Sequence, residues 1–331
     1  MINWKLVVLL SAITYPVSGG ERFAEEGREG QTEHDRQASS YLHAQMINAD
    51  ALKSFDVLIR YEAFHDVAPE RYIRHKILWR LRVDFTARKL LAMKSVERRQ
   101  LDKEVSAEES RQVLLLGGAA TSERAFENRF DGKMRKVPVG MPDALEHLEM
   151  VDVRYVGLTS FPRASATHSS FAQTLAASKA VQGFQTLPAG PDRLKLFRET
   201  PIGNAIADWS YNEWTFDTSA LVATNYYDEI RREIDGKRVA YPICRESVEW
   251  KDADGVYVPI RIVGTEAKVE LIDGKPIRYE VDKTAEFQWF SINDKLGDES
   301  FSENLIESND LAHLLIDEDL FEAESVFQKK E

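Results

Sequence analysis

The residues in this sequence that could do chemistry are seven histidines, one cysteine, and scattered serines and carboxylates. No histidine has the H-E-x-x-H spacing that places two zinc ligands on one face of a helix. Ser110, Ser169 and Ser170 lack the G-x-S-x-G context of a serine nucleophile. As the single cysteine, Cys244 excludes an intramolecular disulfide and a zinc site built from several cysteines. The sequence therefore favours a protein that is not an enzyme and has no cofactor or metal.

One catalytic alternative stays open, because four aspartates lie near the ends of expected strands. These are Asp84, Asp152, Asp208 and Asp217. A glycosidase needs two carboxyl groups that face each other across a cleft. The linear order does not show which of the four would meet, so a hydrolase remains the third hypothesis.

The strongest pattern is a strict alternation over residues 73–88. The odd positions are apolar apart from one histidine: Ile73, His75, Ile77, Trp79, Leu81, Val83, Phe85 and Ala87. Most even positions are basic or polar. Successive side chains of a strand point to opposite faces, so this segment predicts a strand with one apolar and one cationic face. At about 3.3 Å per residue the strand would approach ~50 Å, a length typical of strongly curved sheets.

The apolar face is the predicted ligand-binding surface. Its residues, with aromatic residues from other strands, are Ile59, Tyr61, Ile77, Trp79, Leu81, Val83, Phe85, Trp214, Phe287 and Trp289. In a closed sandwich these side chains would be ordinary core. In an open half-barrel they would line a concave pocket able to hold acyl chains, since such sites are mostly apolar with few polar groups.

The cationic face is the second candidate surface. It is formed by Arg74, Lys76, Arg80, Arg82 and Arg88. It could dock an anionic macromolecule, or it could be the solvated face of an antiparallel sheet with cross-strand ion pairs. The acidic C-terminal segment could neutralise this face within the same molecule.

The remaining pattern predicts an α+β domain over residues 40–293, a long-stranded curved antiparallel sheet wrapped around helices. A helix is expected over 40–53, where apolar residues recur at helical spacing. Strands follow on both sides of a helical insertion around 140–205. Two hairpins are expected at the Asp252-Ala253-Asp254-Gly255 and Asp273-Gly274-Lys275-Pro276 turns.

The two ends of the chain have different compositions from the domain. Residues 1–19 combine a lysine, a short apolar stretch and small residues before Gly20, which predicts a signal peptide. Residues 20–39 read as a disordered leader, and 294–331 as an acidic tail that holds most of the formal charge of −12. We expect an exported protein, periplasmic or secreted, with no transmembrane segment after cleavage and no nucleic-acid partner.

Several segments resemble the LolA/LolB-like group of half-barrels, which carry lipoproteins or other lipids through the periplasm. They are Leu52-Lys53-Ser54-Phe55-Asp56-Val57, Val248-Glu249-Trp250, Gly255-Val256-Tyr257-Val258-Pro259, Phe287-Gln288-Trp289-Phe290-Ser291-Ile292-Asn293 and Asp298-Glu299-Ser300-Phe301. The chain is also similar to uncharacterised exported proteins of planctomycete-type bacteria. The resemblance implies an open half-barrel that holds a lipid or a lipidated protein in its concave face. The alternative is a cell-envelope interaction protein that binds an anionic macromolecule through the cationic face.

Overall fold

A computed structural model describes residues 32–68, 71–102, 110–120, 125–129, 134–137, 151–162, 183–202, 208–234, 236–272 and 275–302. The expected signal peptide and most of the acidic tail lie outside these residues. So do the two helices expected within the 140–205 insertion, over 142–150 and 169–181.

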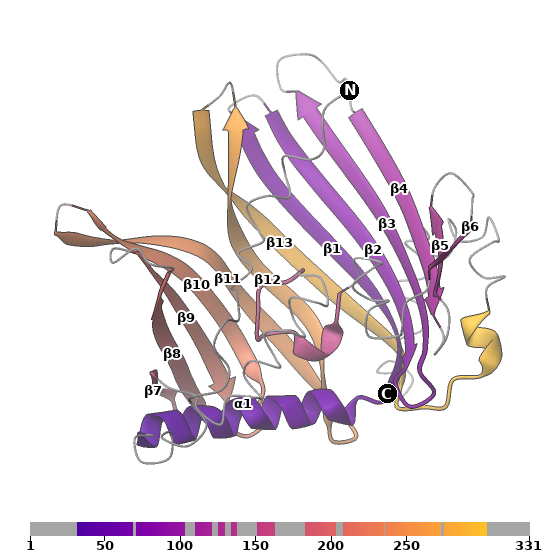
Figure 1. The fold of residues 1–331 in the computed structure, drawn as a ribbon, viewed down its shortest axis with the longest axis horizontal. Coiled ribbons are helices and arrows are strands. Elements are labelled where there is room, and N and C mark those ends of the chain that lie inside the picture. Colours follow the sequence, from indigo (N-terminus) through magenta and orange to yellow (C-terminus); the bar gives the residue numbers. More distant parts are fainter. Residues whose placement is uncertain are drawn as a thin grey trace.

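The described part of the chain contains one antiparallel sheet of thirteen strands (Figure 1). Their bounds are β1 Ser54–Ala68, β2 Arg71–Asp84, β3 Lys89–Asp102, β4 Ser110–Ala120, β5 Ala125–Arg129, β6 Met134–Val137, β7 Phe184–Gly190, β8 Arg193–Pro201, β9 Asp208–Asp217, β10 Ala223–Ile234, β11 Lys237–Ala253, β12 Val256–Ile272 and β13 Lys275–Ile292. The spatial order is β6-β5-β4-β3-β2-β1-β13-β12-β11-β10-β9-β8-β7. Two meanders, one from each half of the chain, are thus joined where β1 pairs with β13.

The sheet is open, because β6 and β7 form its two edges and do not pair with each other. The strands are long and fan out in a curved wall (Figure 1). Strand β2 confirms a long alternating strand, and its residues pair in register with β1 over most of their length. It ends at Asp84, four residues before the expected end, because residues 85–88 form the turn to β3. The expected α+β class with a curved antiparallel half-barrel is confirmed.

Several strands differ from the expected boundaries. The helical insertion around 140–205 was wrong for its last part, where β7 and β8 form a hairpin around Pro191 and Asp192. Leu194 and Leu196 alternate with exposed or half-buried residues, which is a strand signal that the Gly and Pro content obscured. The final strands, β12 and β13, are continuous over 17 and 18 residues.

The single long helix in the described residues is α1, Glu33–Ala51. It begins seven residues before the expected residue 40, so the leader prediction was wrong for this part. The reason is a capping box, in which Thr32 and Asp35 satisfy each other's free backbone N–H groups. Ala38, Leu42, Gln45 and Ala49 form its buried stripe. The helix lies across one end of the curved wall (Figure 1).

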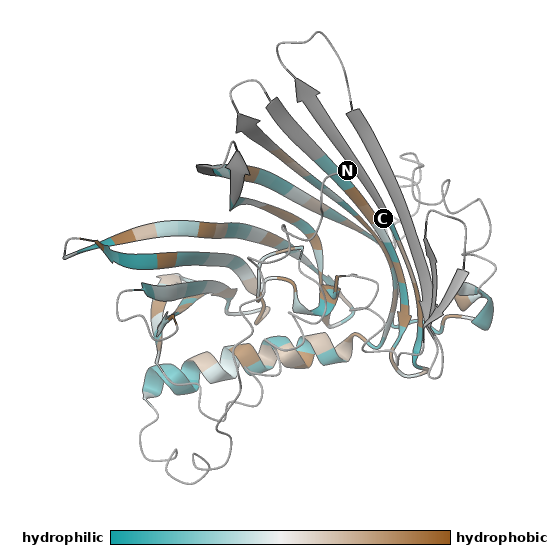
Figure 2. Cartoon of the chain, turned by 45° about the horizontal axis from the view of Figure 1, so that its top comes forward, coloured by the Kyte–Doolittle hydropathy of each residue, from teal (hydrophilic) through white to brown (hydrophobic). Residues whose placement is uncertain are grey.

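The face of the sheet that packs against α1 is called the inner face here, and the opposite side the outer face. The inner face is also crossed by residues 151–162, called the strap. The strap has one short 3-10 turn, Val153–Tyr155, and is otherwise irregular. Hydrophobic and hydrophilic residues alternate along many of the described strands (Figure 2), as one buried face requires. No helix among the described residues combines the length and the apolar composition needed to cross a bilayer.

Candidate functional site

The structure brings the predicted ligand-binding residues together on the inner face. One core cluster contains Ile59, Tyr61, Trp79, Leu81, Val83, Phe287 and Trp289, with Ile77 and Phe85 packed against it. Trp214 lies in a second cluster, between α1 and strands β8 to β11. The ten residues therefore share a face but form two neighbouring apolar regions rather than one.

The strap covers the centre of the first cluster. The Phe161 ring lies 6.1 Å from Tyr61, 6.0 Å from Trp79 and 5.7 Å from Phe287, measured between ring centroids. Trp79 and Phe161 are almost fully buried. The expected concave pocket is thus filled by one aromatic side chain of the same chain, since an apolar surface of this size is unfavourable in water.

Polar contacts fix the strap at two further points. Trp214 Nε1–H donates to the Leu158 carbonyl oxygen at 3.0 Å. Gln45 Nε2 donates to the Val156 carbonyl oxygen at 3.3 Å, and its Oε1 accepts from the Ala223 N–H at 2.7 Å. Because Gln45 is fully buried on α1, it ties the helix, the strap and β10 together.

A buried ion pair is hydrogen-bonded to the main chain of the strap next to the aromatic cluster. Lys283 Nζ lies 2.5 Å from Glu246 Oε1, and the two side chains are 1% and 0% exposed. Glu246 accepts from the Phe161 N–H at 2.7 Å, and Lys283 donates to the Phe161 carbonyl oxygen at 2.7 Å. Ser160 Oγ accepts from Lys283 at 3.0 Å and donates to Glu246 at 3.2 Å. Both charges are therefore paired and also hydrogen-bonded to the strap.

The buried pair acts as a clamp that holds the strap through its hydrogen bonds to Ser160 and Phe161. Burial acts to lower the pKa of Lys283, but the charge of Glu246, with smaller contributions from Cys244 and Glu266, outweighs it and raises the pKa above the ordinary value. Lys283 therefore stays protonated and offers Ser160 no free base, although the two side chains are within hydrogen-bond distance.

Burial, together with the charge of Glu246, raises the pKa of the Cys244 thiol to about 12. The thiol is also inaccessible, with 2% of the residue exposed. Because the thiolate is the reactive form, we expect iodoacetamide at about pH 8 to leave native Cys244 unmodified and to alkylate it fully in urea. Intact-mass spectrometry measures the difference. Fast alkylation of the folded protein would contradict this placement of the thiol.

Sequence reasoning missed the pair, although a signal was present. Lys283 stands between the inward-facing Val281 and Ala285 of β13, and Glu246 between Cys244 and Val248 of β11. Each is a charged residue at an apolar position of an alternating strand, which requires a buried partner. The sequence did not show that these two would be each other's partner.

Each of the four aspartates of the hydrolase alternative forms an ion pair or a hydrogen bond within a turn. Asp84 accepts from the Ala87 N–H in the β2–β3 turn. Asp152 caps the 3-10 turn and pairs with Arg154 at 2.7 Å. Asp208 forms an ion pair with Arg232, and Asp217 accepts hydrogen bonds from the backbone of the β9–β10 turn. Among the described residues no group of three or more His, Cys, Asp or Glu side chains could hold a metal ion.

Several residues of the cationic face interact with other groups of the same chain. Asp56 Oδ1 lies 2.6 Å from Arg80 Nε, and Asp56 Oδ2 lies 2.9 Å from Arg82 Nε. The Arg80 guanidinium also lies 3.6 Å from the centroid of the Phe290 ring. Lys76 has an interaction partner as well. Arg88 is exposed in the β2–β3 turn, and the side chain of Arg74 lies outside the described residues. Pairing with Asp56 reduces the charge that this face can offer to a partner.

The beginning of the acidic tail packs against the same outer face. Lys89 forms an ion pair with Asp298, and Arg82 donates to the Ser300 carbonyl oxygen at 3.5 Å. Phe301, in the 3-10 turn Asp298–Phe301, is buried there. This contact agrees with the expected intramolecular neutralisation for the described part of the tail.

Comparisons with known proteins give only distant likenesses. No protein-family model matches the chain, and no curated protein matches it. Among solved structures, the chain is similar to a putative outer membrane lipoprotein-sorting protein domain from Vibrio parahaemolyticus, with 9% identity, a TM-score of 0.35, and coverage of 82% of this chain and 100% of that one. A DUF1329 family protein from Desulfovibrio piger has the same identity and TM-score, with 82% and 99% covered. A β-barrel-like DUF1849 protein from Brucella abortus is 10% identical, with a TM-score of 0.26 and 72% and 100% covered.

The three likenesses are distant both in sequence identity and in TM-score. At TM-scores below 0.5 they carry no argument about what this chain binds. The functional conclusion therefore depends on the geometry of the inner face.

Proposed function

We propose that this protein is an exported, non-enzymatic binding protein that holds an apolar ligand on the inner face of its open sheet. The ligand would be the acyl chain of a lipid or of a lipidated protein. The observation that carries the proposal is the way the inner face is closed. An irregular strap, and not a second sheet, covers the aromatic cluster of Tyr61, Trp79 and Phe287.

An irregular strap can leave the sheet without breaking the hydrogen bonds between strands. Displacing Phe161 would expose a continuous apolar surface formed by β1, β2 and β13, the kind of surface that binds acyl chains. The strap would then act as a plug that occupies the ligand position in the empty protein. Exposing this surface to water would be unfavourable, so the strap should leave it only when a ligand replaces Phe161.

One polar group on the inner face supports a ligand with a polar end. Among the residues that the structure describes, the buried Trp79 indole N–H has no hydrogen-bond partner. A buried donor without a partner costs about 1–3 kcal/mol, which an ester or carboxyl oxygen could recover. A fatty acyl chain with such a group fits this surface better than a plain hydrocarbon.

The cationic-face alternative has less support. Arg80 and Arg82 are turned to Asp56, and the described part of the tail binds Lys89. Of the two hypotheses, the apolar ligand is the one that the geometry favours.

The test is native mass spectrometry of the protein purified without detergent from an exporting host, followed by organic extraction and lipid analysis. We expect a co-purifying acyl-chain species at near-unit stoichiometry. A clean apo mass, together with no uptake of added fatty acid or phospholipid, would show that the inner face is ordinary core.

A further inference from the structure

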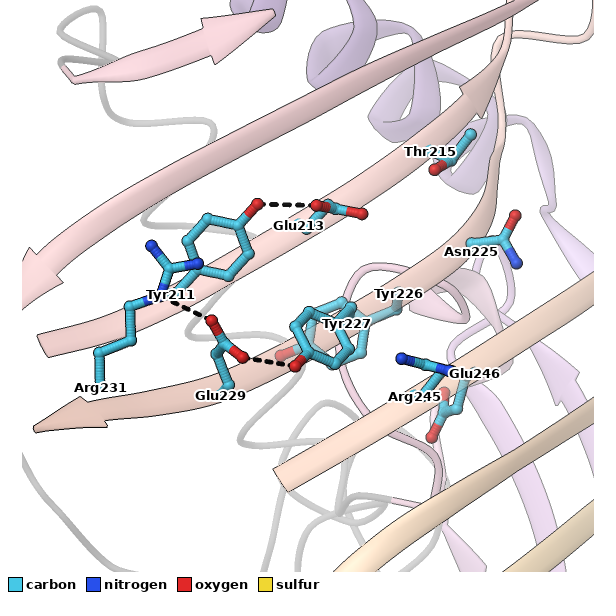
Figure 3. Close-up of a pocket in the computed structure, with 10 residues that line it drawn as sticks. All are labelled: Tyr211, Glu213, Thr215, Asn225, Tyr226, Tyr227, Glu229, Arg231, Arg245 and Glu246. Atoms are coloured by element: carbon cyan, nitrogen blue, oxygen red, sulfur yellow. Dashed lines mark hydrogen bonds and ion pairs between the residues drawn. The ribbon is translucent and has the colours of Figure 1, made fainter. Parts of the chain in front are cut away.

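A second candidate site lies on the outer face and is independent of the proposed function. A cavity of about 510 Å³ is lined by residues of β9, β10 and β11 (Figure 3). Tyr211, Glu213 and Thr215 alternate with the inner-face residues Trp214 and Phe216, so they point to the outer side. The cavity is within the 300–1,000 Å³ range typical of small-molecule sites.

An irregularity in β10 places further side chains in this cavity. The register with β9 shifts between Ala223 and Asn225, so Asn225 pairs with Thr215, and Tyr227 pairs with Glu213. Asn225 and Tyr227 therefore share the outer side with the β9 residues, while Tyr226 keeps its inner-face contact with Trp214. Register shifts of this type re-aim side chains.

One half of the cavity is a closed network of its own groups. Tyr211 donates to Glu213 at 2.7 Å, and Tyr227 donates to Glu229 (Figure 3). Arg231 donates to Glu229 Oε1 at 2.6 Å, and its guanidinium lies 3.8 Å from the centroid of the Tyr211 ring. Glu229 is 4% exposed. These side chains are fixed and form a rigid wall.

The lining residues hold three carboxylates and two guanidinium groups, and two of the carboxylates are paired with lysines outside the lining. Each of the three lining carboxylates already has a cation: Glu213 has Lys195 at 2.8 Å, Glu229 has Arg231, and Glu246 has Lys283 on the inner face. Arg245 is exposed and, among the described residues, has no carboxylate within ion-pair distance. Its guanidinium lies 5.5 Å from the centroid of the Tyr227 ring, within cation–π distance.

Arg245 lies at the same end of the cavity as Asn225 and Thr215 (Figure 3). A guanidinium presents a planar fork of donors that fits a carboxylate or a phosphate with two parallel hydrogen bonds. The cation–π contact with Tyr227 favours a position of this fork at the cavity. The amide and the hydroxyl beside it are suited to sugar or glycerol hydroxyl groups.

We propose that this outer-face cavity binds a small hydroxylated oxyanion, with Arg245 holding its phosphate or carboxylate group and Asn225 and Thr215 contacting its hydroxyl groups. The anion could be a free metabolite or the headgroup of a lipid in a membrane surface. The two sources share the same chemistry at Arg245.

Isothermal titration calorimetry at low salt tests the proposal with glucose 6-phosphate, glucuronate and uncharged glucose. Flotation with phosphatidylcholine vesicles, with and without phosphatidic acid, tests the headgroup source. We expect the anions, or the vesicles that contain phosphatidic acid, to bind and glucose not to bind. Arg245→Gln should weaken the binding at least about tenfold, since it removes a charged pair of hydrogen bonds.

Arg261→Gln is the matched control. Arg261 is a half-exposed arginine of the neighbouring strand β12, it does not line the cavity, and its loss changes the net charge equally. We expect it to bind like the wild type. Binding to phosphatidic acid vesicles alone would assign the oxyanion to a headgroup. The proposal would be overturned if Arg245→Gln and Arg261→Gln bound the anions with equal affinity, or if glucose bound as tightly as the anions. It would also be overturned if no anion and no vesicle bound to the wild-type protein.

Discussion

Lys283→Met is expected to lower the free energy of unfolding by about 3–5 kcal/mol, because it leaves the Glu246 carboxylate buried without its cation. The substitution also removes the hydrogen bond to the Phe161 carbonyl oxygen. Urea denaturation followed by tryptophan fluorescence measures the loss. The effect is large because neither charge is open to water, so solvent cannot replace the missing partner.

Lys195→Met is the matched control for this experiment. Lys195 pairs with Glu213 at 2.8 Å, but about a third of its side chain is exposed. Exposed pairs contribute about 0–1 kcal/mol, so the control should cost little. The double variant Lys283→Met/Glu246→Leu removes both charges and should recover part of the loss. A loss for Lys283→Met no larger than that for the control would contradict the clamp.

The Lys283–Glu246 pair should also affect how the free energy of unfolding of the wild-type protein changes at alkaline pH. Because the pKa of Lys283 is higher in the folded protein than the ordinary 10.5, the folded state holds its proton more tightly than the unfolded state does. The stabilising contribution is therefore complete below about pH 10 and decreases as the pH rises above 10.5. Lys283→Met should lack this alkaline component.

Phe161→Ala is expected to increase the uptake of an uncharged apolar probe, N-phenyl-1-naphthylamine, by opening the aromatic cluster on the inner face. The ring is 1% exposed and contacts Tyr61, Trp79 and Phe287, so its removal should also cost about 3–5 kcal/mol of stability. Probe fluorescence, titrated under conditions where circular dichroism shows a folded protein, reports the uptake.

Phe301→Ala separates this effect from general loosening of the core. Phe301 is also a buried phenylalanine, but it lies in the 3-10 turn that packs on the outer face. We expect this variant to lose stability without gaining probe uptake. If both variants take up the probe equally, the inner face is not a special apolar site and the plug role of the strap is wrong.

The sequence by itself determined many of the strands and their faces, although not β7 and β8. Alternation at every second residue is a local property, so the apolar side of β2 could be read from the sequence, and Trp79, Leu81 and Val83 are buried on that side. The same reasoning gave the turn at Asp254 and Gly255, both of which have positive φ angles in the structure. The start of α1 was also encoded locally, in Thr32 and Asp35, although the expected helix began too late.

Only the tertiary structure decided what these faces meet. The Lys283–Glu246 pair joins β13 to β11, and its contact with Phe161 spans more than 80 residues of chain. The pairing of β1 with β13 and the crossing of the strap over the inner face are equally long-range. Local periodicity states which side of a strand avoids water, but not which distant segment will cover it. That choice depends on packing and on the pairing of buried charges, which exist only once the chain has folded.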